Sequence, residues 1–199
     1  MARFFIAAAV AAIAVNLSGA PAFAQSAESA VTALDLKKCR HTRGKVEEDY
    51  GSWRCSGYNG IAVYVAAGDQ RSYVSFGPKA KDEPAAKQTL ASFNGEGKSI
   101  EWRLQRGADK KAVPYAAIMR WSTTVSTDDR PVRGQVLVVM RLAPGPVCHV
   151  GYVDAGANPD ANALAQKIAD ERARDFRCGT DKAIVMGKKG PGFSGPYGD

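Results

Sequence analysis

The chain lacks the residue patterns by which many metal proteins and redox enzymes are recognised. Its four cysteines form no C-x-x-C pair, and it has only two histidines. Zinc sites favour closely spaced ligand pairs, and thioredoxin-type sites need C-x-x-C, so neither is expected. A G-x-S-x-G nucleophile elbow and a P-loop are also missing. The sequence therefore predicts neither a metal nor a cofactor.

Long apolar runs are also scarce, and the one clear run stands at the start of the chain. Arg3 precedes unbroken apolar residues from Phe4 to Val15, and Ala22-Phe23-Ala24 supplies the small-x-small pattern that signal peptidase accepts. A transmembrane helix needs ~20 apolar residues, which makes an N-terminal anchor the weaker alternative. We predict a signal peptide over residues 1–24, export to a bacterial periplasm, and no transmembrane segment after cleavage.

Negative charge is in short supply, because 27 Lys and Arg residues face 20 Asp and Glu residues, for a formal charge of +7. The basic residues are scattered, so one interpretation is a dispersed excess that aids solubility. The other is a patch for an anionic ligand, and Arg40, Arg43 and Lys45 form the densest cluster. Export disfavours nucleic acid as a partner. We expect either an envelope protein or an anionic envelope component.

An even number of cysteines in an exported chain predicts disulfides. Cys39, Cys55, Cys148 and Cys178 allow three pairings, and the sequence alone does not select one. We favour Cys39–Cys55 with Cys148–Cys178, because each pair then closes a modest loop within one local unit. Each bridge would contribute on the order of 3–4 kcal/mol, mainly by restricting the unfolded chain.

The strand pattern predicts an α+β fold. Between residues 38 and 154 the chain is rich in β-branched and aromatic runs, and residues 99–105 alternate apolar and polar side chains. The short connections between successive runs favour hairpins. We expect a single domain over residues 25–185, with a mainly antiparallel sheet of about six strands. A flexible Gly/Pro-rich tail is expected over residues 186–199.

One long helix is expected near the C-terminus, packed on the sheet. Asn158 suits the N-cap, Pro159 the first helical position, and Gly179 a stop signal. Arg172 falls inside the apolar stripe of this helix, where a charge costs free energy unless it is paired. We therefore predict an ion pair or hydrogen bonds to backbone carbonyls for Arg172, which is also a candidate binding residue.

Two further places could carry a site. Asp69 and Arg71 flank a predicted hairpin tip near Tyr73, where they could contact a ligand; the alternative is a turn salt link with the tyrosine in the sheet surface. His149 is another candidate binding residue, and it forms a nearby acid/base pair with Asp154. Five residues apart on a regular strand, these two would lie on opposite faces. That spacing counts against catalysis by this pair.

Two sets of motifs carry a resemblance to a known group of proteins. They are Cys55-x-Gly57-Tyr58-x-Gly60, and Cys148-His149-x-x-Tyr152-x-Asp154 followed by Asn158-Pro159. Most of the mature chain resembles uncharacterised exported proteins of alphaproteobacteria, which implies compartment and compactness but no reaction. A weaker resemblance is to small periplasmic lysozyme inhibitors, which are exported, disulfide-bonded β-proteins. The positive charge argues against binding a basic lysozyme, because like charges slow encounter.

Together these features predict a non-catalytic exported protein that binds a partner in the cell envelope. The alternative is a periplasmic hydrolase acting on an envelope polymer through His149 and Asp154. A deep pocket holding His149 beside a carboxylate would favour the hydrolase. A contiguous basic or apolar patch would favour binding.

Overall fold

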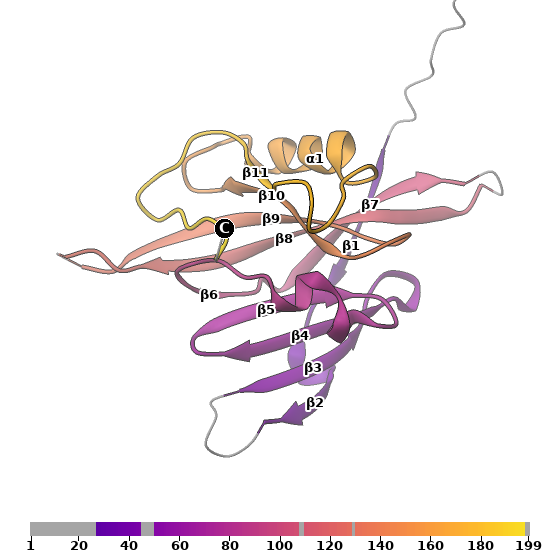
Figure 1. The fold of residues 1–199 in the computed structure, drawn as a ribbon, viewed down its shortest axis with the longest axis horizontal. Coiled ribbons are helices and arrows are strands. Elements are labelled where there is room, and N and C mark those ends of the chain that lie inside the picture. Colours follow the sequence, from indigo (N-terminus) through magenta and orange to yellow (C-terminus); the bar gives the residue numbers. More distant parts are fainter. Residues whose placement is uncertain (1–26, 45–49, 108–109, 129, 198–199) are drawn as a thin grey trace, which may run out of the picture.

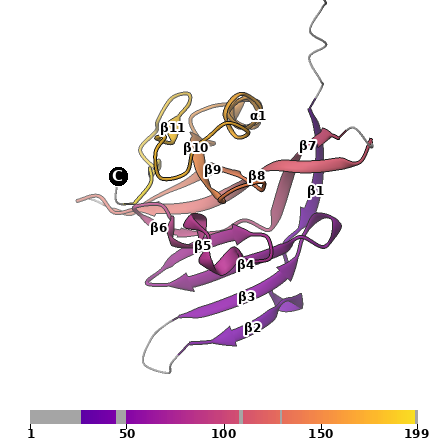
Figure 2. The same ribbon diagram turned by 45° about the vertical axis from the view of Figure 1, so that its right-hand side comes forward.

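The computed structural model describes residues 27–44, 50–107, 110–128 and 130–197. These residues form three layers, a helix, a large sheet and a small sheet, stacked in that order (Figure 1). The large sheet lies in the middle, and its two faces are covered by the helix and by the small sheet (Figure 2). The predicted signal peptide, residues 1–24, lies outside the described residues.

The elements fall into two sheets and one helix. The large sheet has the order β1-β7-β8-β9-β10-β11, with β6 paired to β8, and consists of β1 (Glu28–Ala33), β6 (Phe93–Gly95), β7 (Ser99–Arg106), β8 (Ala112–Val125), β9 (Val132–Arg141), β10 (Cys148–Asp154) and β11 (Ile184–Val185). The small sheet runs in chain order through β2 (Arg40–Arg43), β3 (Gly51–Ser56), β4 (Ala62–Gly68) and β5 (Arg71–Phe76). The helix is α1 (Ala161–Arg172), and short 3-10 turns span Leu36–Lys38, Tyr58–Gly60, Ala80–Asp82 and Pro84–Lys87.

The predicted α+β fold is confirmed. Strands β7, β8, β9 and β10 pair antiparallel in succession, as the short connections between their runs indicate. Strand β11 pairs parallel to β10 over two residues and is the exception among the described strands. The large sheet is therefore mainly antiparallel, with one helix packed on it.

The strand count is larger than predicted, because the described strands form a seven-stranded sheet and a separate four-stranded sheet. The β4–β5 hairpin ends at Phe76, and two 3-10 turns then lead the chain to the large sheet. Strands β8 and β9 are buried on both faces along their central residues. A helix of 12 residues covers one of these faces, so the small sheet is needed to cover the other.

Trp102 of β7 fixes how the two sheets pack. Its ring meets Phe76 of the small sheet edge-on, with 5.3 Å between centroids, and its Nε1 donates to Thr32 Oγ1 over 2.9 Å. Gly57 passes so close that a Cβ there would lie 2.5 Å from Trp102 Cζ2. A fully buried indole with a satisfied N–H is a strong anchor, and here it joins β1, β7 and the small sheet.

Helix α1 covers the opposite face, and the predicted apolar stripe is confirmed by the burial of Ala161, Ala165, Ile168 and Ala169. The predicted ends of the helix are wrong. Asn158 does not cap the helix, because its amide donates to the carbonyls of Asp154 and Lys188.

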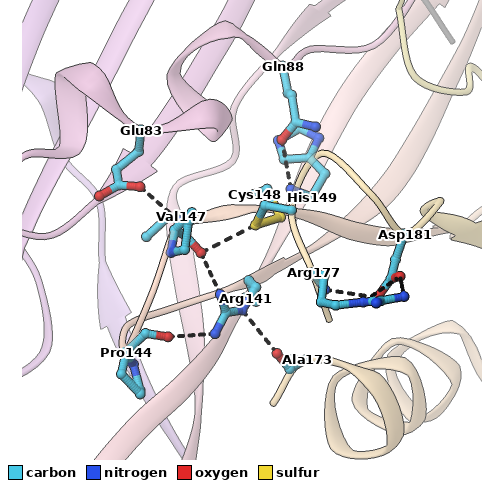
Figure 3. The surroundings of a disulfide bond; sticks show 12 residues. Glu83, Gln88, Arg141, Pro144, Val147, Cys148, His149, Ala173, Arg177 and Asp181 are labelled. Atoms are coloured by element: carbon cyan, nitrogen blue, oxygen red, sulfur yellow. Dashed lines mark hydrogen bonds and ion pairs between the residues drawn. A yellow bond between two sulfur atoms is a disulfide. The ribbon is translucent and has the colours of Figure 1, made fainter. Parts of the chain in front are cut away.

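The C-terminal end of α1 is set by Arg141 of β9, which donates from Nε to the carbonyl of Ala173 over 3.2 Å, next to the Cys148–Cys178 bridge (Figure 3). The same guanidinium donates to the carbonyls of Pro144 and Pro146. One side chain thus ties the end of the helix to the loop before β10.

Both predicted disulfides are confirmed. Cys39 is bonded to Cys55 across a separation of 16 residues, and Cys148 to Cys178 across 30. The first bridge closes the β2–β3 side of the small sheet, and the second ties the segment after α1 to β10. No helix among the described residues is long and apolar enough to cross a membrane.

Hydrogen bonds connect residues 186–197, part of the predicted tail, to the rest of the described chain. Ser194 Oγ accepts from the backbone N–H of Ser92 over 2.8 Å, and Thr123 Oγ1 donates to the Gly192 carbonyl over 2.8 Å. A Cβ on Gly134 would lie 2.1 Å from that carbonyl oxygen. The glycines that suggest flexibility therefore serve close approach between backbones.

Candidate functional site

The outer face of the small sheet, the face turned away from the large sheet, carries a pair of opposed arginines. Arg40 of β2 lies directly opposite Arg54 of β3, and Arg54 lies opposite Tyr64 of β4. Opposed residues in neighbouring antiparallel strands point to the same side, with Cβ atoms ~5 Å apart. The register therefore places the side chains of Arg40, Arg54 and Tyr64 in one row on the same face of the sheet.

These side chains border a recess of about 300 Å³, which we call the basic recess. Its lining is dominated by cationic and hydroxyl-bearing side chains, and consists of Arg40, Thr42, Arg43, Gly44, Tyr50, Ser52, Trp53, Arg54, Tyr64 and Lys81. All four cations are exposed at the surface. No acidic side chain is among these lining residues, so the recess is a concentrated positive site.

The four cations of the basic recess have no acidic partner within the described part of the chain. The ion pairs there involve other residues, and no hydrogen bond is formed by Arg40, Arg43, Arg54 or Lys81 side chains. Like charges directly opposite each other on a sheet are destabilising by a few tenths of a kcal/mol to ~1 kcal/mol. A bound anion would remove that repulsion.

Two tyrosine hydroxyls complete the recess. Tyr50 Oη and Tyr64 Oη lie 3.0 Å apart and share one hydrogen bond. Burial, followed by the contact with Tyr64, raises the pKa of Tyr50 to about 12. Its hydroxyl is therefore protonated at neutral pH, and the pair has one O–H left to donate. The recess offers charge-assisted donors from arginines and a neutral donor from a tyrosine, with no general base among its lining side chains.

The predicted residues Asp69, Arg71 and Tyr73 lie beside the basic recess without entering it. Asp69 and Gln70 both take positive φ at the β4–β5 tip, and Arg71 Nη1 pairs with Asp69 Oδ2 over 2.5 Å. The alternative interpretation, a salt link in the turn, therefore describes this pair. Asp69 and Tyr73 line a shallow cleft that shares Tyr50 with the basic recess.

His149 is enclosed between the sheets. It is 1 % exposed, its Nδ1 lies 2.9 Å from Tyr152 Oη, and its ring meets Trp121 edge-on. Burial lowers its pKa to about 3, so the ring is neutral at physiological pH. A histidine with this burial cannot exchange protons with a bound substrate.

Asp154 does not act with His149, although the prediction of opposite faces is wrong. A bulge between His149 and Gly151 shifts the register, so that His149 and Tyr152 face the same side, and the alternation places Asp154 there too. The Asp154 carboxylate accepts from the backbone N–H groups of Gly156, Ala157 and Gly190. It organises the loop before α1 and leaves no contact with the imidazole.

Arg172 is half-buried, and the predicted ion pair or carbonyl contact is not formed within the described residues. Its Nε is buried without a hydrogen-bond partner. Its charge contributes, as the smallest cause, to the lowered pKa of Asp181, which the hydrogen bond from Arg177 dominates. Arg172 thus interacts with Asp181 only at longer range, far in sequence and layer from the basic recess.

Sequence reasoning found Arg40, Arg43 and Lys45, of which Lys45 lies outside the described residues, but it missed Arg54, Lys81 and Tyr50. A signal for Arg54 was present. Arg40 follows Cys39 and Arg54 precedes Cys55, so the favoured disulfide, if it joins antiparallel strands, brings the two arginines opposite each other. Lys81 lies in the 3-10 turn Ala80–Asp82, and no local sequence pattern predicts its position at the recess.

No protein-family model, curated protein or solved structure matches the chain. The resemblance to exported proteins of alphaproteobacteria therefore stays a prediction.

Proposed function

We propose that this protein is a non-catalytic, exported binding protein that holds a phosphate-bearing anionic component of the cell envelope in the basic recess. The observation that carries the proposal is the opposed pair Arg40 and Arg54, with no acidic partner among the described residues. Arginine guanidinium groups present paired N–H donors that match phosphate oxygens in a bidentate geometry. A phosphate group bound between them would offset the repulsion between the two guanidinium groups and would accept a charge-assisted hydrogen bond from each.

The composition of the recess supports phosphate over a larger polyanion surface. Its volume of about 300 Å³ suits one compact anionic group and the atoms next to it. Tyr50 and Tyr64 add a protonated hydroxyl donor at its wall. Lys81 adds a flexible point charge from a different segment, so the anion would be approached from more than one side.

Two features support the envelope as the place of action. The first is the predicted leader over residues 1–24, with its basic start and small-x-small cleavage pattern. The second is the pair of disulfides, which persist in oxidising compartments such as the periplasm. The alternative of a hydrolase has no supporting observation, because His149 is buried and Asp154 is bonded to backbone amides.

The proposal is tested by calorimetric titration of the mature protein with inorganic pyrophosphate at low ionic strength. We expect binding that weakens as salt is added, and that weakens about tenfold or more in Arg40→Gln and Arg54→Gln. The control is Arg106→Gln, an exposed arginine of the large sheet that pairs with Glu28 and carries the same charge. Binding that is equally reduced in the control would show a net-charge effect and would contradict the proposal.

The source of the phosphate is tested with vesicles. Vesicles containing phosphatidylglycerol represent a lipid headgroup, and pure phosphatidylcholine vesicles lack the net negative charge. Sedimentation with the anionic vesicles, lost in Arg54→Gln, would assign a headgroup. Pyrophosphate binding without sedimentation would assign a phosphate group outside the bilayer. Failure of both pyrophosphate and anionic vesicles to bind would overturn the proposed function.

A further inference from the structure

A second cavity, of about 480 Å³, opens next to the basic recess, and we call it the aromatic groove. It is lined by residues of the β4–β5 tip of the small sheet and of strands β6 and β8 of the large sheet. Its lining combines aromatic rings, glycines, amides and hydroxyls, and consists of Gly51, Trp53, Ala67, Gly68, Gln70, Arg71, Ser72, Phe93, Asn94, Gly95, Ser122 and Thr124. No carboxylate is among these lining residues.

Exposed aromatic side chains gather around this groove. Five large hydrophobic side chains are exposed among the described residues, and the three aromatic ones are Tyr50, Phe93 and Tyr197. Phe93 lines the groove, and Tyr50 lines the basic recess beside it. Tyr197 lies near Phe93, since the Arg71 guanidinium is 5.3 Å from the Tyr197 ring centre and 5.5 Å from that of Phe93. Solvent-exposed rings held in one place by a cation point to a surface for stacking.

Polar groups at the groove are left available for a ligand. Arg71 directs Nη1 to Asp69 and Nη2 to the Ala91 carbonyl, and these contacts hold its guanidinium at the wall of the groove. Gln70 is exposed at the tip, and its side chain forms no hydrogen bond within the described chain. The same holds for Thr124 on the opposite wall. Amide, hydroxyl and guanidinium groups near exposed rings are the combination that sugar rings require.

Trp53 lines the groove, and the register places its side chain with that of Val65 on the inner face of the small sheet. His41 stacks on the Trp53 ring with 4.8 Å between centroids and holds it in place. Gly51 leaves room beside that ring, because a Cβ there would lie 3.1 Å from Trp53 Cη2. The Trp53 ring is therefore held in a fixed position at the wall of the groove.

We propose that the aromatic groove binds the sugar rings of an uncharged glycan chain. This inference goes beyond the proposed function, because it assigns a second ligand class to a cavity separate from the basic recess. The C–H face of a pyranose packs on exposed Phe93 and Trp53, and its hydroxyl groups meet Gln70, Thr124 and Arg71. A groove open to solvent along its length suits a chain that continues beyond the site.

The test uses uncharged sugars, so that it reports on the groove alone. The probes are the β-linked tetramers of glucose, N-acetylglucosamine and mannose. Trp102 and Trp121 are fully buried and Trp53 is partly exposed, so tryptophan fluorescence reports binding at the groove. We expect at least one tetramer to shift the emission and to bind about tenfold more weakly to Phe93→Ala and to Gln70→Ala.

Controls separate this inference from the proposed function. Val113→Ala removes an exposed apolar side chain from a different cavity and should leave sugar binding unchanged. Arg54→Gln should lose pyrophosphate binding and keep the tetramer, whereas Phe93→Ala should show the reverse. If pyrophosphate binds and none of the three tetramers does, the glycan inference is overturned and the proposed function stands. If a tetramer binds and pyrophosphate does not, the proposed function fails.

Discussion

Arginines are treated in opposite ways on the two sides of the molecule. Under α1, Arg103 forms a two-point ion pair with Asp170 and donates to Ser29, and Arg141 donates to three carbonyls. Both side chains are almost fully buried. On the small sheet, Arg40 and Arg54 are exposed and form no ion pair with described residues. Arg103 and Arg141 therefore have hydrogen-bond partners, whereas Arg40 and Arg54 have no acidic partner among the described residues.

This difference assigns the two groups different roles. A buried charge is tolerated only when it is paired and hydrogen-bonded, so Arg103 and Arg141 contribute to the folded structure. Two free arginines held opposite each other do not, because their repulsion works against the sheet. Under our proposal, a bound anion offsets this repulsion.

Removal of the two disulfides is expected to have the largest effects on stability, and it also distinguishes the small sheet from the side of the molecule under α1. In the chain-entropy relation, loss of the 30-residue Cys148–Cys178 bridge costs about 4 kcal/mol, and loss of the 16-residue Cys39–Cys55 bridge about 3 kcal/mol. We expect urea unfolding of the two double Cys→Ser variants to show both losses. Only the Cys39→Ser/Cys55→Ser variant should also bind pyrophosphate more weakly, because that bridge holds Arg40 and Arg54 in register. Unchanged pyrophosphate binding in that variant would show that the bridge is not needed to hold Arg40 and Arg54 in register.

Removal of a buried arginine comes next in size. Arg103→Ala leaves the Asp170 carboxylate without its ion-pair partner, and breaking such a pair costs about 3 kcal/mol. The free energy of unfolding, measured with urea, should fall by that amount while pyrophosphate binding stays the same. A loss below ~1 kcal/mol would show that the pair between Arg103 and Asp170 contributes little to the stability of the folded protein.

His149 provides a smaller, pH-dependent test in the core between the sheets. Its folded pKa is lowered to about 3 by burial, below the ~6.5 of the unfolded chain. The neutral form is therefore favoured by folding, and its contribution is present above pH ~6.5 and lost as the pH falls toward 3. The expected loss is ~1.4 kcal/mol per pH unit within that window. We expect the free energy of unfolding, measured with urea at pH 6 and at pH 5, to fall less steeply with pH in His149→Gln by about that amount. An equal fall in the variant and the wild type would contradict the assignment of the low pKa to His149.

Much of the fold could be predicted from local pattern, and the parts that could not depend on tertiary contacts. The alternation over residues 99–105 identified β7, and the turn residues near Asp69 identified the β4–β5 hairpin. Strand β1 was missed because its small residues give a weak apolar signal, and it is held by Trp102 and β7. The bulge that turns His149 toward Tyr152 has no sequence signature. The prediction that His149 and Asp154 lie on opposite faces of the strand was therefore wrong.

The site was predictable to the extent that it follows from the cysteines. Arg40 and Arg54 each adjoin a bridged cysteine, so pairing the cysteines pairs the arginines. Tyr50, Tyr64 and Lys81 come to the recess only through packing of other elements on the small sheet. Charge composition alone could not distinguish these free cations from paired ones such as Arg103.

The stability of Arg54→Gln, measured with and without pyrophosphate, addresses the central claim most directly. Without the ligand, relief of the opposed charges should raise the free energy of unfolding by about 0.5 kcal/mol at low salt, and molar salt should remove the difference. With saturating pyrophosphate the order should reverse, because only the wild-type protein gains binding energy. A variant that is less stable than the wild type to the same degree in both conditions would mean that Arg54 supports the fold and that the recess holds no anion.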